Sequence, residues 1–144
     1  MKNTFQSISI SLLIILYIYA ALSKLLTFSE FRQQLHNQNL YPGFATFLLY
    51  FLPAAEIITA QLLCFRSTVV FGLIASGALL ATFTGYISLV MLHFWNRTPC
   101  SCGGILSHMS WTMHLIFNWV FLLLNLVALY LEYAGRKPQM QVTD

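Results

Sequence analysis

Four long stretches of this 144-residue sequence contain no more than one Asp, Glu, Lys or Arg each. They cover residues 8–26, 44–65, 69–94 and 111–131, and each supplies about the 20 apolar residues that a helix needs to cross a bilayer. Charged residues make up only 8% of the chain, whereas a soluble domain carries about 25%. The sequence therefore predicts an all-α membrane protein, with four transmembrane helices forming one domain over residues 1–144.

The composition also excludes two other classes of protein. Hydrophobic residues make up 58% of the chain, which is incompatible with intrinsic disorder, because disordered chains combine low hydrophobicity with high net charge. The seven Lys and Arg residues are scattered along the chain, whereas a nucleic-acid-binding surface needs them clustered. We therefore expect the lipid bilayer to surround most of the protein and expect no nucleic-acid partner.

The short connections between the four stretches predict an antiparallel bundle with both termini on one side. Cytoplasmic loops carry an excess of Lys and Arg, and the side of the termini would hold four such residues against three. We therefore expect cytoplasmic N- and C-termini, with residues 24–43 and 96–110 on the opposite face. The four are Lys2, Arg66, Arg136 and Lys137, and the three are Lys24, Arg32 and Arg97. A cleaved signal peptide is the alternative for the first stretch, because it has a basic start and an apolar core.

Two of the three cysteines, Cys100 and Cys102, lie one residue apart in the loop 96–110. A bond between cysteines this close closes a small ring that fits normal disulfide geometry poorly, and strained disulfides are the ones that are easily reduced. Arg97 and His108 make the loop electropositive, which favours the reactive thiolate. Gly103 and its neighbouring glycine leave the backbone open to a partner. We therefore expect Cys100 and Cys102 to exchange disulfides with that partner.

Other interpretations of these cysteines remain open. A structural disulfide would restrict the unfolded chain little, because the closed loop is very short. Zinc binding by Cys100, Cys102 and His108 has a poor ligand spacing for a finger or ribbon, so we predict no metal site. The two thiols could also be inert. The third cysteine, Cys64, lies in the second apolar stretch and is expected to be a small core residue.

Polar residues inside the apolar stretches are costly in a bilayer and therefore indicate function. Glu56 lies three residues after Pro53, and Lys24 is its expected partner because a lysine side chain can reach inward. Such a pair could lock the bundle or relay protons.

The fourth stretch carries polar residues at intervals of seven, which fall on nearly one face of a helix. They are Trp111, Asn118, Asn125 and Glu132, with His114 three residues after Trp111. Hydrogen bonds between helices are the ordinary function of buried asparagines. The alternative is a site beside the cysteine loop, where a quinone headgroup stacks on Trp111 and His114 exchanges a proton.

Several of these features together resemble the redox-associated MauE and DoxX-like membrane proteins. The resemblance extends from about Ile8 to Tyr133, and its most specific part is the cysteine loop. It rests on the segments Ser23-Lys24-Leu25, Pro53-Ala54-Ala55-Glu56 and Pro99-Cys100-Ser101-Cys102-Gly103-Gly104, together with Trp111 and Asn118. It implies a bacterial inner-membrane protein that forms or transfers disulfides for periplasmic proteins. The family's association with thiosulfate:quinone chemistry also implies a quinone as electron partner.

We therefore expect a multi-pass thiol–disulfide oxidoreductase of the bacterial inner membrane. Cys100 and Cys102 are the expected catalytic residues, and the partner is a periplasmic thioredoxin-like or disulfide-containing client. The expected supporting residues are Arg97, Gly103, Trp111, His114, Asn118, Glu56 and Lys24. The alternative is a non-enzymatic subunit or assembly factor of a larger membrane complex. It would dock through Gly77, Ala81 and Gly85, whose spacing lets helix backbones approach closely, or through surfaces rich in aromatic residues.

Overall fold

The computed structural model describes residues 4–37, 41–92 and 110–136, and this part of the chain is almost entirely helical. Four of its helices are long and apolar enough to cross a membrane, as the sequence predicts. They are α1 (Thr4–Leu26), α3 (Pro42–Cys64), α4 (Val69–Met91) and α5 (Trp111–Arg136), and the shorter α2 (Phe28–His36) follows α1.

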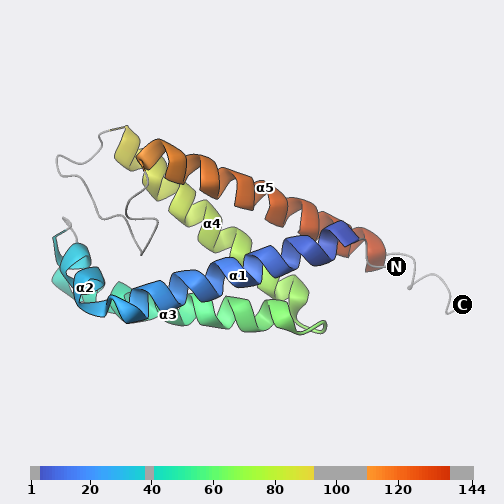
Figure 1. Ribbon diagram of the computed structural model, residues 1–144, viewed down its shortest axis with the longest axis horizontal. Coiled ribbons are helices and arrows are strands. Elements are labelled where there is room, and N and C mark those ends of the chain that lie inside the picture. Colours follow the sequence, from blue (N-terminus) through green and yellow to red (C-terminus); the bar gives the residue numbers. More distant parts are fainter. Residues whose placement is uncertain (1–3, 38–40, 93–109, 137–144) are drawn as a thin grey trace, which may run out of the picture.

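The long helices form two pairs, since α1 packs most extensively on α3 and α4 on α5. Contacts between α3 and α4 and between α1 and α5 join the pairs (Figure 1). The first residues of α1 and the last residues of α5 lie at one end of the molecule, whereas α2 lies at the other end (Figure 1). The described ends of α4 and α5 that border residues 93–109 lie at the same end as α2.

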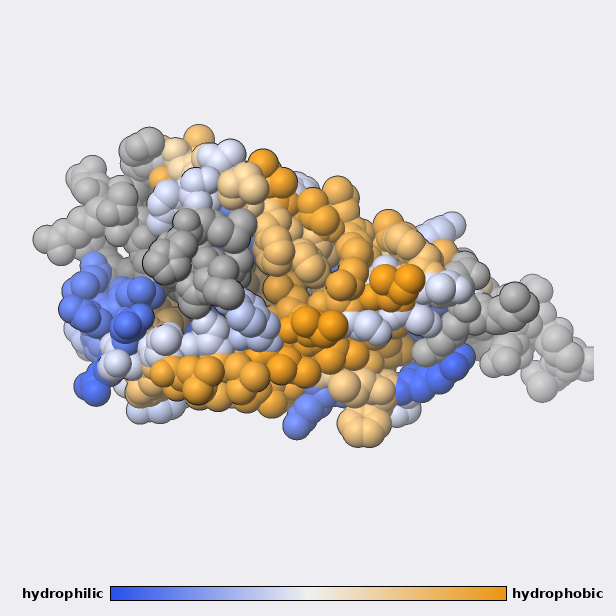
Figure 2. All heavy atoms as spheres, viewed as in Figure 1, coloured by the Kyte–Doolittle hydropathy of each residue, from blue (hydrophilic) through white to orange (hydrophobic). Residues whose placement is uncertain are grey.

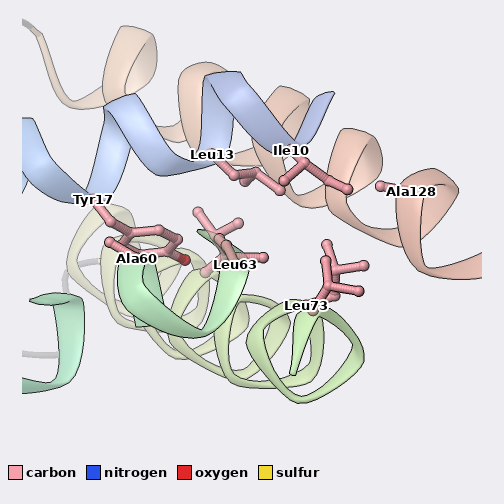
Figure 3. Packing of buried hydrophobic residues seen from close by; sticks show 9 residues of the cluster. Ile10, Leu13, Tyr17, Ala60, Leu63, Leu73 and Ala128 are labelled. Carbon is pink, nitrogen blue, oxygen red and sulfur yellow. The ribbon is translucent and has the colours of Figure 1, made fainter. Parts of the chain in front are cut away.

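All four long helices contribute to a shared apolar core. Its buried side chains include Leu13 of α1, Leu63 of α3, Leu73 of α4 and Ala128 of α5, which converge in Figure 3. Lipid tails are as apolar as these side chains, so close van der Waals packing rather than escape from water holds such helices together.

The outer surface of the bundle is apolar as well. Many large hydrophobic side chains are exposed, among them Ile15, Phe47, Phe71 and Leu123. Hydrophobic surface covers much of the middle of the face in Figure 2, while hydrophilic surface gathers at the end that carries α2 and, in smaller patches, toward the opposite end. A soluble protein rarely exposes such a large continuous apolar surface, so this surface is suited to lipid.

The helix α2 was not expected from the sequence, which shows only a polar segment there. It is amphipathic, because Phe31 and Leu35 are buried one turn apart while Glu30 and Arg32 are exposed. The two apolar side chains pack in one cluster with residues of α3, including Leu49. Phe28, Phe31 and Leu35 follow one another at spacings of three and four, which is the amphipathic pattern that could have identified this helix from the sequence.

The backbones of α3 and α4 approach each other closely at Gly72, which does not belong to the series of small residues Gly77, Ala81 and Gly85. A Cβ atom at Gly72 would lie 2.9 Å from the backbone of Leu62 and Leu63 in α3. Gly77 faces Asn125 of α5, but Ala81 is exposed, and a Cβ atom at Gly85 would meet nothing within 4 Å. Gly77 therefore packs against α5, whereas Ala81 and Gly85 lie on the outer surface of α4.

Candidate functional site

A buried ion pair joins α1 to α3. Lys24 Nζ donates a hydrogen bond to Glu56 Oε1 over 2.7 Å, and the two side chains are only 3% and 2% exposed. Lys24 Nζ also lies 3.4 Å from the carbonyl oxygen of Ala20. This is the pairing expected from the sequence. Burying two charges is unfavourable unless they are paired and well hydrogen-bonded, so the pair is a costly feature that the bundle retains.

The pair lies on the wall of a cavity between the four long helices. The cavity has a volume of about 60 Å³, which is room for a few water molecules. It lies in the half of the bundle that carries α2, because its residues come from the second halves of α1 and α4 and the first half of α5 (Figure 1). The lining residues are Leu16, Tyr17, Ala20, Lys24, Glu56, Leu80, Phe83, Tyr86, Ile87, Trp111, His114, Phe117 and Asn118.

Three buried polar residues, Lys24, Glu56 and Asn118, form what we call the polar floor of the cavity. Glu56 Oε2 is buried and has no hydrogen-bond partner among the described residues. Asn118 Nδ2 is likewise buried without a partner in the described part of the chain. A buried polar atom left unpaired costs about 1–3 kcal/mol, so a hydrogen-bonding group that reached these two atoms of cavity-lining residues would be stabilised there.

Four half-buried aromatic residues form what we call the aromatic rim of the cavity. They are Phe83 and Tyr86 of α4 and Trp111 and Phe117 of α5. His114, which is also half-buried, lines the cavity from the first turn of α5. An apolar wall with a few convergent polar groups is the usual composition of a small-molecule site.

The polar stripe of α5 divides into two parts with different surroundings. Trp111 and Asn118 line the cavity, whereas Asn125 Nδ2 donates to the carbonyl oxygen of Leu73 over 3.0 Å. Glu132 accepts a hydrogen bond from Gln6 of α1. The second half of the stripe therefore connects helices, which is the ordinary function of such residues.

Tyr17 is a cavity residue that was not predicted from the sequence. Its hydroxyl group lies 3.0 Å from Ser76 Oγ and 3.1 Å from the carbonyl oxygen of Ser76, which connects α1 to α4. Tyr17 precedes Lys24 by seven residues, so the two share a helix face. This spacing, the same one that identified the stripe of α5, was the available signal.

The structure thus gathers five of the expected site residues around one cavity: Lys24, Glu56, Trp111, His114 and Asn118. The other four lie outside the described residues: Arg97, Cys100, Cys102 and Gly103.

Cys64 is exposed at the C-terminal end of α3, so the expectation that it is a core residue is wrong. Its side chain lies on the outer face of the helix, where a weakly polar thiol is tolerated. Among the described residues, no three His, Cys, Asp or Glu side chains lie close enough together to hold a metal ion.

The fold and the cavity define a class of protein, the multi-pass helical membrane protein with a mainly apolar cavity between its helices that contains a few polar groups. A family model described as methylamine utilisation protein MauE matches residues 2–131. Because the match covers most of the chain, the chain belongs to the MauE family, which confirms the resemblance found in the sequence. Comparison with curated proteins and with solved structures finds no match.

Proposed function

We propose that this protein exchanges disulfides with periplasmic proteins through Cys100 and Cys102. The observation that carries the proposal is the C-x-C pair in the segment that joins α4 to α5. Trp111, which lines the cavity, follows Cys102 by nine residues, and a chain of that length reaches at most about 30 Å. The two thiols are therefore tethered to the site with the polar floor and the aromatic rim.

In this proposal the chain is an antiparallel bundle in the bacterial inner membrane, with both termini in the cytoplasm. Support comes from the fold, since the beginning of α1 and the end of α5 lie at one end of the molecule. Arg66, in the turn between α3 and α4, adds positive charge to the proposed cytoplasmic side, in agreement with the bias of cytoplasmic loops. The helix α2 and the cysteine segment then belong to the periplasmic side.

The exchange begins when a client thiolate attacks one sulfur of the Cys100–Cys102 disulfide and forms a mixed disulfide. The second client thiolate then displaces the cysteine of this protein, which leaves the client oxidised and the pair reduced. Two electrons and two protons pass from the client to Cys100 and Cys102. Arg97 supports the reaction by favouring thiolate, and Gly103 leaves the backbone accessible to the client. A quinone is the acceptor class that returns the pair to the disulfide, by taking up the two electrons and two protons.

The test is to trap the mixed disulfide. In Cys100→Ser or Cys102→Ser, the remaining thiolate can attack the disulfide of an oxidised client, which reverses the last step of the exchange and releases one client thiolate. In cells, each variant is expected to accumulate this mixed disulfide, because the second cysteine that would release the client is missing, and the complex is visible on non-reducing gels and lost on reduction. Cys64→Ser is the matched control, because it removes an exposed thiol from the other end of the bundle. If neither single variant captures a client, and the double serine variant fully replaces the natural protein in a deletion strain, the proposal is wrong.

A second candidate function is that of a subunit that docks a larger membrane complex. The observation that favours it is the exposure of Ala81 and Gly85 on the outer face of α4, where a partner helix could approach closely. In that case, a partner would copurify at fixed stoichiometry with the double serine variant and would be lost from Gly85→Leu. Loss of the partner on removal of the thiols would favour disulfide exchange instead.

A further inference from the structure

We infer that the cavity binds the ring of a membrane quinone, with its oxygen-bearing edge against the polar floor. The inference deepens the proposed function, because it assigns the electron acceptor to a site and to residues of this chain. Only the redox role of the ligand depends on the proposed function. The binding site itself rests on the geometry of the described residues.

The first argument comes from the unpaired polar atoms. Asn118 Nδ2 can donate to a carbonyl oxygen, and Glu56 Oε2 can accept from a hydroxyl group, and neither atom has a partner in the regions that the structure describes. A quinone ring presents a carbonyl oxygen when oxidised and a hydroxyl group when reduced. The polar floor therefore offers a hydrogen bond to either form.

The second argument comes from charge. Lys24 and Glu56 neutralise each other over 2.7 Å, so the polar floor carries no net charge. An anionic headgroup such as a lipid phosphate would be attracted by Lys24 but repelled by Glu56, and no arginine of the described residues lines the cavity. A neutral ligand with hydrogen-bonding oxygens fits these surroundings best.

The third argument comes from shape and from the apolar walls. The volume of about 60 Å³ is smaller than the roughly 150 Å³ of a cavity that encloses benzene. Only the edge of a ring therefore enters, while its flat body lies between the half-buried side chains of the aromatic rim. Aromatic rings pack well against one another in offset or edge-to-face arrangements. Apolar residues such as Leu80 and Ile87 complete the wall.

The assignment balances the redox chemistry of the proposed function. Oxidation of the Cys100 and Cys102 thiols to a disulfide releases two electrons and two protons, and reduction of a quinone to the hydroquinone takes up the same number. The chain's own contribution at this site is to orient the ring through Asn118 and to accept a hydrogen bond at Glu56 Oε2.

The test is equilibrium binding of a short-chain ubiquinone to the full-length protein in lipid nanodiscs, with empty nanodiscs to subtract partitioning into lipid. We expect saturable binding with one site per chain. Asn118→Ala is expected to weaken it about tenfold, the effect of losing one hydrogen bond in a buried site. Asn125→Ala is the matched control, because it removes the same side chain seven residues further along α5 and outside the cavity, and it should bind normally.

Uptake that does not exceed that of empty nanodiscs would overturn the inference, as would equal binding by Asn118→Ala and the natural protein. A second measurement covers the case in which Asn118→Ala fails to fold: in the natural protein, excess ubiquinone should protect Trp111 from photolabelling by an azidoquinone. Binding is also measured in the Cys100→Ser/Cys102→Ser variant, where it should persist. Binding without client trapping defeats the proposed function alone, and trapping without binding defeats this inference alone.

Discussion

At the scale of single residues, a partner for one atom of a buried polar side chain does not satisfy the whole group. Asn125 donates to the carbonyl oxygen of Leu73, but its Oδ1 atom is buried without a partner in the described part of the chain. Glu56 accepts from Lys24 through Oε1 and leaves Oε2 unpaired among the described residues, and Asn118 leaves Nδ2 unpaired there. Unpaired buried polar atoms are unfavourable in an apolar interior. Glu56 and Asn118 differ from Asn125 because they line the cavity, where a ligand can supply the missing partner.

Replacing one member of the Lys24–Glu56 pair should destabilise the bundle more than replacing both. Lys24→Met or Glu56→Met alone leaves one buried charge without its partner, and we expect each to lower the free energy of unfolding by about 3 kcal/mol. The double variant should recover most of this loss, because both charges are gone. Reversible unfolding in mixed lipid–detergent micelles measures all three variants. Additive losses from the two single changes would contradict the buried pairing.

The two asparagines of α5 should respond differently to the same substitution. Asn125→Ala removes a hydrogen bond between helices and should cost about 1 kcal/mol of unfolding free energy, a typical value inside a membrane. Asn118→Ala removes a donor that has no partner in the described part of the chain, so its cost should be smaller. The same unfolding experiment compares them. A larger loss from Asn118→Ala would show that this side chain is mainly structural.

At the scale of the elements, one glycine controls how closely α3 and α4 pack. Gly72 lies against the backbone of α3, whereas Gly85, thirteen residues later on the same helix, is open. Regular spacing along α4 does not reveal this difference, because every helix face repeats with the same period. Only the position of the neighbouring helix decides which glycine is needed.

Gly72→Ala should therefore destabilise the bundle and Gly85→Ala should not. A methyl group at Gly72 would meet the α3 backbone at 2.9 Å, and overpacking of this kind costs about 1–3 kcal/mol. At Gly85 the methyl group meets nothing within 4 Å. Unfolding of the two variants under identical conditions provides the comparison. Equal stability of the two proteins would mean that α3 and α4 pack less tightly at Gly72 than this distance requires.

At the scale of the whole molecule, the sequence predicts the class of fold well and the site in part. Long stretches with almost no charged residues predict membrane helices. Lys24 and Glu56 could be paired from the sequence because they are the only charged residues inside the first two stretches. The cavity could not be predicted, since it depends on how two helix pairs come together. Leu80 and Phe83 look like ordinary core residues in the sequence, and only the tertiary arrangement places them at the cavity.

The orientation of the bundle in the membrane determines whether the proposed chemistry is feasible, because lasting disulfides form on the oxidising periplasmic side. Ser29 in α2 and Ser67 in the turn between α3 and α4 are both exposed and belong to opposite ends of the molecule (Figure 1). Each is replaced by cysteine in a chain whose three natural cysteines are serine. In intact spheroplasts, a membrane-impermeant maleimide should label Ser29→Cys, and it should label Ser67→Cys only after permeabilisation.

The reverse pattern would put the end that carries α2, together with the flanks of the cysteine segment, in the reducing cytoplasm. Since thioredoxin and glutathione systems keep thiols reduced there, Cys100 and Cys102 could not then oxidise periplasmic clients, whatever their reactivity.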